Sequence, residues 1–124
     1  MIIAVDFDGT LHKAEWPEIG DPTPGAVEAM RRLKDDGHYL IIWTCREGKY
    51  RYDMYDWMVK QGIPFDAIND NNSNLAKEFG YNARKVYADI YIDDHNLGGL
   101  PSWTEIYSIV SGEVKPYLIY KILK

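Results

Sequence analysis

The sequence contains a single cysteine, Cys45, so an internal disulfide is excluded and a reducing, cytoplasmic location is expected. No stretch approaches the ~20 consecutive apolar residues that cross a bilayer, so we expect no membrane partner. No basic segment precedes the first apolar run at Ile2, so we expect no signal peptide. Repeats, low-complexity tracts and linkers are also lacking, and we therefore expect one domain over residues 1–124.

Basic residues are in the minority, since 14 Lys and Arg stand against 19 Asp and Glu and give a formal net charge of −5. This balance argues against an extended nucleic-acid surface, which would need a basic face. Disorder is excluded as well, because 46% of the residues are hydrophobic and only 27% are charged. The acids are unevenly placed: Asp6 with Asp8, and Asp93 with Asp94, form two clusters that each follow an apolar run.

Short apolar runs alternate along the chain with segments of helical periodicity. Such an alternation predicts an α/β fold, a three-layer Rossmann-like arrangement with a mainly parallel sheet and helices on both faces. The loop from His12 to Pro24 is polar and turn-prone, with Thr23 as the expected cap of a helix that begins at Pro24. The expected strands are 2–5, 39–43, 65–68 and 90–92, with 117–122 as a possible last strand, and the other helices are 47–61, 74–79 and 100–110.

The acid clusters are expected at the carboxyl ends of the strands, which is where parallel sheets bind ligands. Asp6 and Asp8 stand two residues apart, so in an extended segment their side chains point the same way. Gly9 permits a sharp turn and a close approach of the backbone to a ligand. Two carboxylates ~4 Å apart repel by about 4 kcal/mol at an effective dielectric constant of ~20, which favours a bound cation. An all-oxygen set of ligands suits Mg²⁺, whereas solvated acids at a turn are the alternative for one cluster alone.

Three segments together resemble the haloacid dehalogenase superfamily of phosphotransferases, in its capless branch. The segment Asp6-Phe7-Asp8-Gly9-Thr10 matches the first motif of that family in full. The run that ends at Thr44 is similar to the second motif, and the run that ends in Asp93-Asp94 is similar to the acidic fourth motif. The resemblance covers residues 1 to about 96, and we assign no role to residues 97–124.

The resemblance implies a role for each of these positions. Asp6 would be the nucleophile that forms an aspartyl-phosphate, and Asp8 the general acid and base, with its backbone carbonyl on the metal. Asp93 and Asp94 would complete the Mg²⁺ site with Asp6. The phosphate oxygens would contact Gly9, Thr44, the backbone N–H of Cys45 and a lysine, Lys85.

The position of this lysine is open on the sequence. A straight strand from Val86 to Asp93 would place Lys85 ~26 Å from Asp93, at ~3.3 Å per residue. Lys85 can therefore contact the phosphate only if the chain reverses direction near Asp89. Lys77, on the short helix after the third expected strand, is the alternative.

Other residues near the motifs have two interpretations each. Arg46 either meets a second phosphate or carboxylate of the substrate or is an exposed arginine at a helix start. Trp16 is either a lid residue over the site or a local anchor. Tyr52 and Tyr55 lie off the expected apolar face of their helix and are candidates for a homo-oligomer contact.

The sequence therefore predicts a Mg²⁺-dependent hydrolase of phosphate monoesters that acts on a phosphorylated small molecule or a nucleotide. Relatives in the superfamily commonly carry a cap domain, but the short gap between Leu11 and Pro24 leaves no room for one, and an open site is expected. The sequence leaves two alternative functions open for the same fold: a phosphoacceptor or regulatory domain, and a non-catalytic binding domain.

Overall fold

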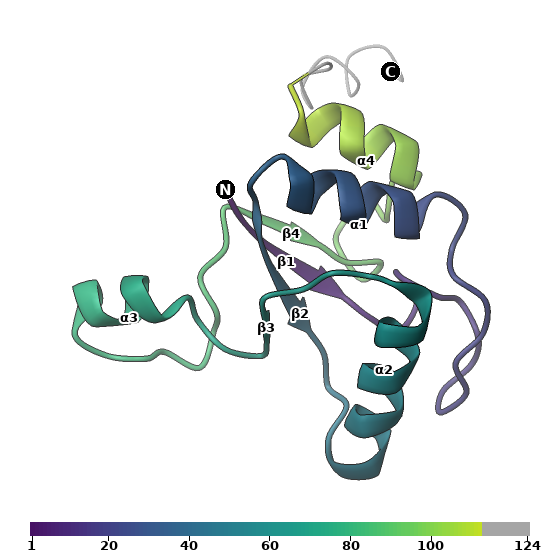
Figure 1. Cartoon of the computed structure of the whole chain (residues 1–124), viewed down its shortest axis with the longest axis horizontal. Helices are drawn as coiled ribbons and strands as arrows, with labels where there is room; N and C mark the ends of the chain where they lie inside the picture. Colours follow the sequence, from purple (N-terminus) through teal and green to yellow (C-terminus); the bar gives the residue numbers. More distant parts are fainter. Residues whose placement is uncertain (113–124) are drawn as a thin grey trace.

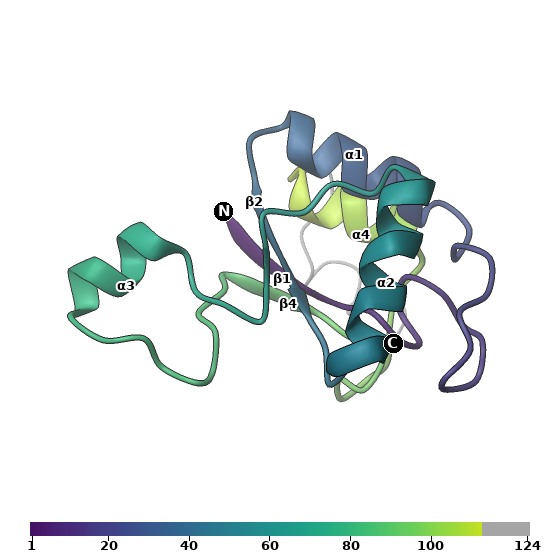
Figure 2. The same cartoon turned by 60° about the horizontal axis from the view of Figure 1, so that its bottom comes forward.

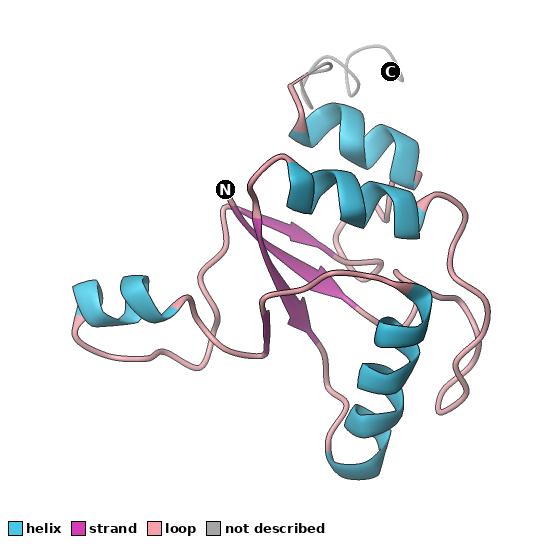
Figure 3. Cartoon of the chain, in the orientation of Figure 1, coloured by secondary structure: helices cyan, strands magenta, loops and turns pink. Residues whose placement is uncertain are grey.

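The protein is a four-stranded parallel sheet with four helices in a computed structural model that describes residues 1–112 (Figures 1 and 3). The predicted α/β Rossmann-like class is thereby confirmed, and residues 1–112 contain no cap domain. The possible strand at 117–122 lies outside the described residues. The elements in chain order are β1 (Ile2–Asp6), α1 (Ala26–Asp35), β2 (Tyr39–Trp43), α2 (Gly48–Gln61), β3 (Ala67–Ile68), α3 (Ser73–Phe79), β4 (Ile90–Ile92) and α4 (Trp103–Val110).

The strand order β3-β2-β1-β4 places β1 at the centre, between β2 and β4. Asp6 pairs with Trp43 at the end of β2, so Thr44 follows directly beside Asp6. Val5 pairs with Ile92 at the end of β4, which brings Asp93 to the same edge. The register of the sheet alone therefore gathers Thr44 and both acid clusters at the carboxyl ends of the strands.

The main core lies on one face of the sheet, under α1, α2 and α4. Side chains from β1 and β2 on this face, Ile3, Val5 and Ile42 among them, are fully buried against the helices. This distribution corrects the expectation of helices on both faces. Because β1, β2 and β3 follow one another in one direction across the sheet, right-handed crossovers place α1 and α2 on the same side.

The opposite face is covered by a loop. The return from β3 to β4 passes this face, and there Val86 and Ala88 are buried against Ala4 and Ile41. The helix of this return, α3, has no buried residue, and it projects from the sheet in both views (Figures 1 and 2).

Helix α1 begins later than predicted. The expected cap, Thr23, instead donates its hydroxyl to the carbonyl of Thr10 at 2.9 Å, and the helix starts at Ala26 after Gly25. The competing hydrogen bond ties the start of the helix to the loop that follows β1. Helices α2 and α3 begin within about one residue of the predicted positions, and α4 begins about three residues later than predicted.

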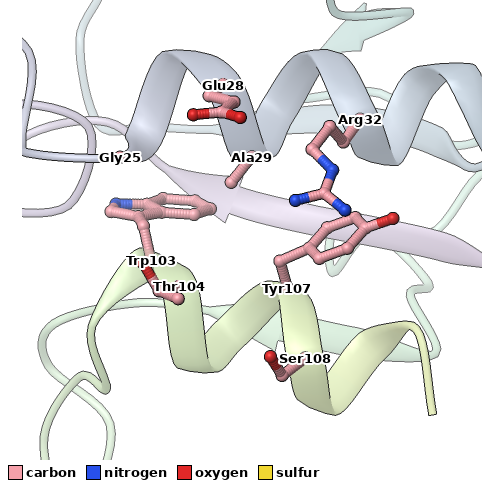
Figure 4. A pocket seen from close by; sticks show the side chains of 8 residues that line it. All are labelled: Gly25, Glu28, Ala29, Arg32, Trp103, Thr104, Tyr107 and Ser108. Carbon is pink, nitrogen blue, oxygen red and sulfur yellow. The ribbon is translucent and has the colours of Figure 1, made fainter. Parts of the chain in front are cut away.

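Helices α1 and α4 lie side by side over the core (Figure 4). The Arg32 guanidinium of α1 stacks on the Tyr107 ring of α4, 3.9 Å from its centroid, and the Tyr107 hydroxyl donates to Asp36 at 2.7 Å. A cavity of about 340 Å³ lies between the two helices, at a different place from the acid clusters. In the part of the chain that the structure describes, no helix combines the length and apolar character of a membrane span.

Candidate functional site

Three carboxylates converge at the carboxyl ends of β1 and β4. Asp6, Asp93 and Asp94 each offer an oxygen within 4.8 Å of those of the other two, and all three side chains are partly buried. Burial, a hydrogen bond with Asp94 and the charge of Asp93 together raise the pKa of Asp6 to about 8. An oxygen-only set of this kind fits a hard cation such as Mg²⁺, and the cation would relieve the repulsion.

The turn after β1 is shaped to admit Asp94. Gly9 has φ +85°, and a Cβ at this position would lie 2.3 Å from Asp94 Oδ2. A side chain at Gly9 would therefore displace the Asp94 carboxylate and would also strain the backbone.

Thr10 joins the two acid clusters through its buried hydroxyl. Its Oγ1 lies 3.0 Å from Asp6 Oδ2 and 3.3 Å from Asp94 Oδ1, and it accepts a hydrogen bond from the Asp94 backbone N–H. The Trp103 indole of α4 donates to the Thr10 carbonyl at 3.1 Å. The sequence indicates no role for Trp103, whereas Thr10 is the last residue of the first motif and could have been identified from it.

Asp8 is separate from the three-carboxylate group and is held by two basic side chains. Arg46 donates to both of its oxygens at 2.8 Å, and the ring nitrogen Nε2 of His12 lies 2.8 Å from Asp8 Oδ1. Burial would raise the pKa of Asp8, but the hydrogen bonds from Arg46 and His12 outweigh it and the pKa is lowered. The Asp8 side chain is thus an ionised acceptor and not a fourth member of the carboxylate group.

Arg46 is buried, with 1% of its surface exposed, so the interpretation as an exposed helix-start arginine is wrong. Besides Asp8 it donates to the carbonyls of Pro17 and Tyr50. Its guanidinium lies 4.7 Å from the centroid of the Trp16 ring. Trp16, which is half exposed, also packs on the Tyr50 ring at 4.8 Å between centroids, so the loop is anchored locally at this tryptophan.

Thr44 is held by a residue that sequence reasoning missed. The Asn69 side chain accepts from the Thr44 N–H at 2.8 Å and donates to the Thr44 carbonyl at 2.7 Å. Thr44 Oγ1 in turn accepts from the Arg46 backbone N–H. Asn69 directly follows β3 as Thr44 follows β2, so its place at the end of a predicted strand was the signal that could have identified it.

The acids and their neighbours line an open pocket of about 400 Å³. Its lining includes most of the predicted site residues, together with His95, which the sequence did not assign. The lining residues are Asp6, Asp8, Trp16, Thr44, Cys45, Arg46, Asp93 and His95.

The two candidate lysines are not among these lining residues. The chain does turn back before β4 as the Lys85 hypothesis required, because the Tyr91 hydroxyl donates to the Val86 carbonyl at 2.6 Å. Lys85 Nζ lies 5.5 Å from the centroid of the Tyr91 ring. Lys77 is exposed on the projecting helix α3. The structure thus brings neither lysine to the carboxylates.

No family model and no curated protein matches the chain. A solved structure is similar, described as that of the conserved protein coded by a locus from Bacteroides thetaiotaomicron, with a TM-score of 0.85. The two sequences are 38% identical, and the match covers 97% of each chain. The chain belongs to the same family as this conserved Bacteroides thetaiotaomicron protein.

Proposed function

We propose that the protein is a Mg²⁺-dependent phosphohydrolase that cleaves phosphate monoesters through an aspartyl-phosphate on Asp6. The observation that carries the proposal is the convergence of Asp6, Asp93 and Asp94 within 4.8 Å of one another. Two of these acids, Asp6 and Asp93, line one open pocket together with Asp8 and Thr44. The resemblance to the haloacid dehalogenase superfamily supports it, because residues from all three matching motifs line this pocket.

Asp6, Asp93 and Asp94 would hold the cation. When bound, Mg²⁺ would neutralise the negative charge of the cluster and of the phosphoryl group, which keeps Asp6 ionised despite its raised pKa. Thr44, fixed by Asn69, would offer its hydroxyl to the phosphate oxygens, together with the backbone N–H of Cys45.

In the first step an Asp6 carboxylate oxygen attacks phosphorus, and the bond from phosphorus to the ester oxygen breaks. Because the lowered pKa keeps Asp8 ionised, the leaving oxygen takes its proton from solvent water in the open pocket and becomes an alcohol. The proton that Asp8 accepts in the next step is returned to solvent. In the second step water attacks the phosphorus of the aspartyl-phosphate, Asp8 accepts the proton of that water, and the Asp6 carboxylate and inorganic phosphate are released. The lowered pKa of Asp8 suits this second role, since an ionised carboxylate is required to accept a proton.

The open pocket of about 400 Å³ suits a phosphorylated small molecule or a nucleotide. Trp16 offers a half-exposed aromatic ring at its rim, on which a base could stack.

The test is hydrolysis of 4-nitrophenyl phosphate with and without Mg²⁺ by the wild type and by Asp6→Asn. We expect Asp6→Asn to lose ~10³-fold or more in kcat with an unchanged circular dichroism spectrum. Asp53→Asn, an exposed aspartate of α2, is the matched control and keeps wild-type activity. Equal activity of Asp6→Asn and wild type would remove the mechanism.

Two further measurements separate the alternatives. A rapidly quenched reaction with acetyl phosphate, analysed by mass spectrometry, would show a persistent phosphate on Asp6 in a phosphoacceptor domain. A non-catalytic binding domain would show neither turnover nor phosphorylation with Mg²⁺ across a panel of phosphorylated metabolites and nucleotides.

A further inference from the structure

We infer that His12 is a positioning residue for Asp8, with its tautomer set by the backbone of the loop over residues 14–20. The catalytic consequence of this inference rests on the proposed function, whereas the tautomer and its link to Asp8 do not.

The tautomer follows from the surroundings of the ring. His12 is fully buried, and its Nδ1 faces two backbone donors, the N–H of Ala14 at 3.1 Å and the N–H of Gly20 at 3.4 Å. A nitrogen that faces N–H donors must act as the acceptor, so the ring proton is on Nε2. The Nε2–H therefore donates to Asp8 Oδ1, at 2.8 Å.

The ring has little freedom to leave this position. It packs against the Phe7 ring at 4.8 Å between centroids and lies 6.0 Å from the centroid of Trp57. The Trp57 indole donates to the Gly20 carbonyl at 3.0 Å, so the same residue that faces Nδ1 is itself fixed by α2.

Asp8 is held from two directions by groups that both contact one loop. Its Oδ1 accepts from His12 and from Arg46, while its Oδ2 accepts from Arg46 alone. His12 contacts the loop at Ala14 and Gly20, and Arg46 contacts it at the Pro17 carbonyl. The conformation of the loop and the orientation of the Asp8 carboxylate are therefore linked through two buried side chains.

A histidine with a purely structural role would stabilise only the loop, through the acceptor at Nδ1. Two substitutions separate this role from the positioning of Asp8 by the Nε2 donor. In His12→Gln the amide nitrogen takes the place of Nε2 and keeps a donor for Asp8, but the acceptor at Nδ1 is lost. In His12→Asn the amide oxygen takes the place of Nδ1 and keeps the acceptor for the loop, but the donor to Asp8 is lost.

If His12 positions Asp8, His12→Asn lowers kcat for 4-nitrophenyl phosphate on the order of 10- to 100-fold with KM within about threefold, and His12→Gln restores most of kcat. The reverse order of the two variants, or wild-type kcat in both, would overturn the inference.

A ¹⁵N spectrum of the His12 imidazole gives a second test that needs no turnover. We expect a protonated Nε2 and a bare Nδ1 in the wild type, and faster exchange of the Nε2 proton with solvent in Asp8→Ala. A proton on Nδ1, or an exchange rate that does not change in Asp8→Ala, would contradict the inference. A wild type that shows the expected spectrum and no phosphatase activity would instead refute the proposed function alone.

Discussion

The Arg46 guanidinium donates one hydrogen bond to each oxygen of the Asp8 carboxylate, Nε to Oδ2 and Nη2 to Oδ1, both at 2.8 Å. The arginine is buried, whereas 30% of the Asp8 side chain is exposed, so the pair lies between the interior and the pocket. Only the planar fork of arginine makes both bonds at once, because a lysine ammonium is a single point of charge.

We therefore expect Arg46→Met to destabilise the protein by about 3 kcal/mol, the lower end of the range for breaking a buried ion pair, because solvent partly compensates Asp8. Urea unfolding measures the change. The double variant with Asp8→Asn should recover part of the loss, since it removes the uncompensated charge. A stability of Arg46→Met equal to that of the wild type would show that the pair makes no net contribution.

Gly9→Ala should weaken the binding of Mg²⁺, because the new Cβ would lie 2.3 Å from Asp94 Oδ2 and must displace the carboxylate. Gly98→Ala is the matched control: its φ of +92° resembles the +85° of Gly9, but no atom lies within 4 Å of the added Cβ. Both variants should lose about 1–2 kcal/mol from the left-handed backbone conformation. Only Gly9→Ala should also lose the rise in melting temperature on addition of Mg²⁺, and an equal rise in the two variants would contradict this role of Gly9.

The sequence predicted the parallel sheet and the meeting of Asp6, Thr44, Asp93 and Asp94, because the end of a strand is a local signal and the shared edge follows from topology. It did not predict the partners of these residues. His12 reaches Asp8 only because the loop folds back, which periodicity does not encode. Asn69 meets Thr44 because β3 pairs with β2, but the end of a strand does not tell which side chain bonds to which backbone group.

The burial of Arg46 could not be predicted from the sequence either. Its position after Thr44 favoured either a substrate contact or exposure, since arginines are seldom fully buried. The structure buries it because three protein acceptors, Asp8 and the carbonyls of Pro17 and Tyr50, satisfy its donors. These acceptors come from separate segments of the chain, so no local sequence pattern predicts that they meet Arg46.

Asn69 supports Thr44 through two hydrogen bonds, and it does so at a φ of +53°. We expect Asn69→Ala and Asn69→Gly to weaken inhibition by inorganic phosphate to the same extent, since both remove the side chain that fixes Thr44. Their stabilities should differ, with Asn69→Gly more stable than Asn69→Ala by roughly 1 kcal/mol because glycine adopts positive φ without strain. Phosphate inhibition that is unchanged in both variants would show that Thr44 needs no support from Asn69.

The raised pKa of Asp6 predicts that the metal-free protein becomes less stable as the pH rises. Between the ordinary value of 3.8 and the folded value of about 8, the folded state keeps a proton on Asp6 that the unfolded state has released. The free energy of unfolding therefore falls with increasing pH through this window and levels off above it. Asp8 acts in the opposite sense, because its lowered pKa gives stability that is lost only as the solution becomes more acidic.

Thermal unfolding in a chelator between pH 5 and pH 9 measures this dependence. His38 also titrates in this range, because burial and the N-terminal amino group lower its pKa, and it adds stability as the pH rises. The comparison with Asp6→Asn separates the contribution of Asp6 from that of His38. Asp6→Asn should lose the decline, and Asp53→Asn should keep it. Saturating Mg²⁺ should raise the melting temperature more at pH 8 than at pH 5, because the cation favours the ionised carboxylates that the metal-free site resists. A decline of the same slope in Asp6→Asn would show that Asp6 is not the group that titrates in this window.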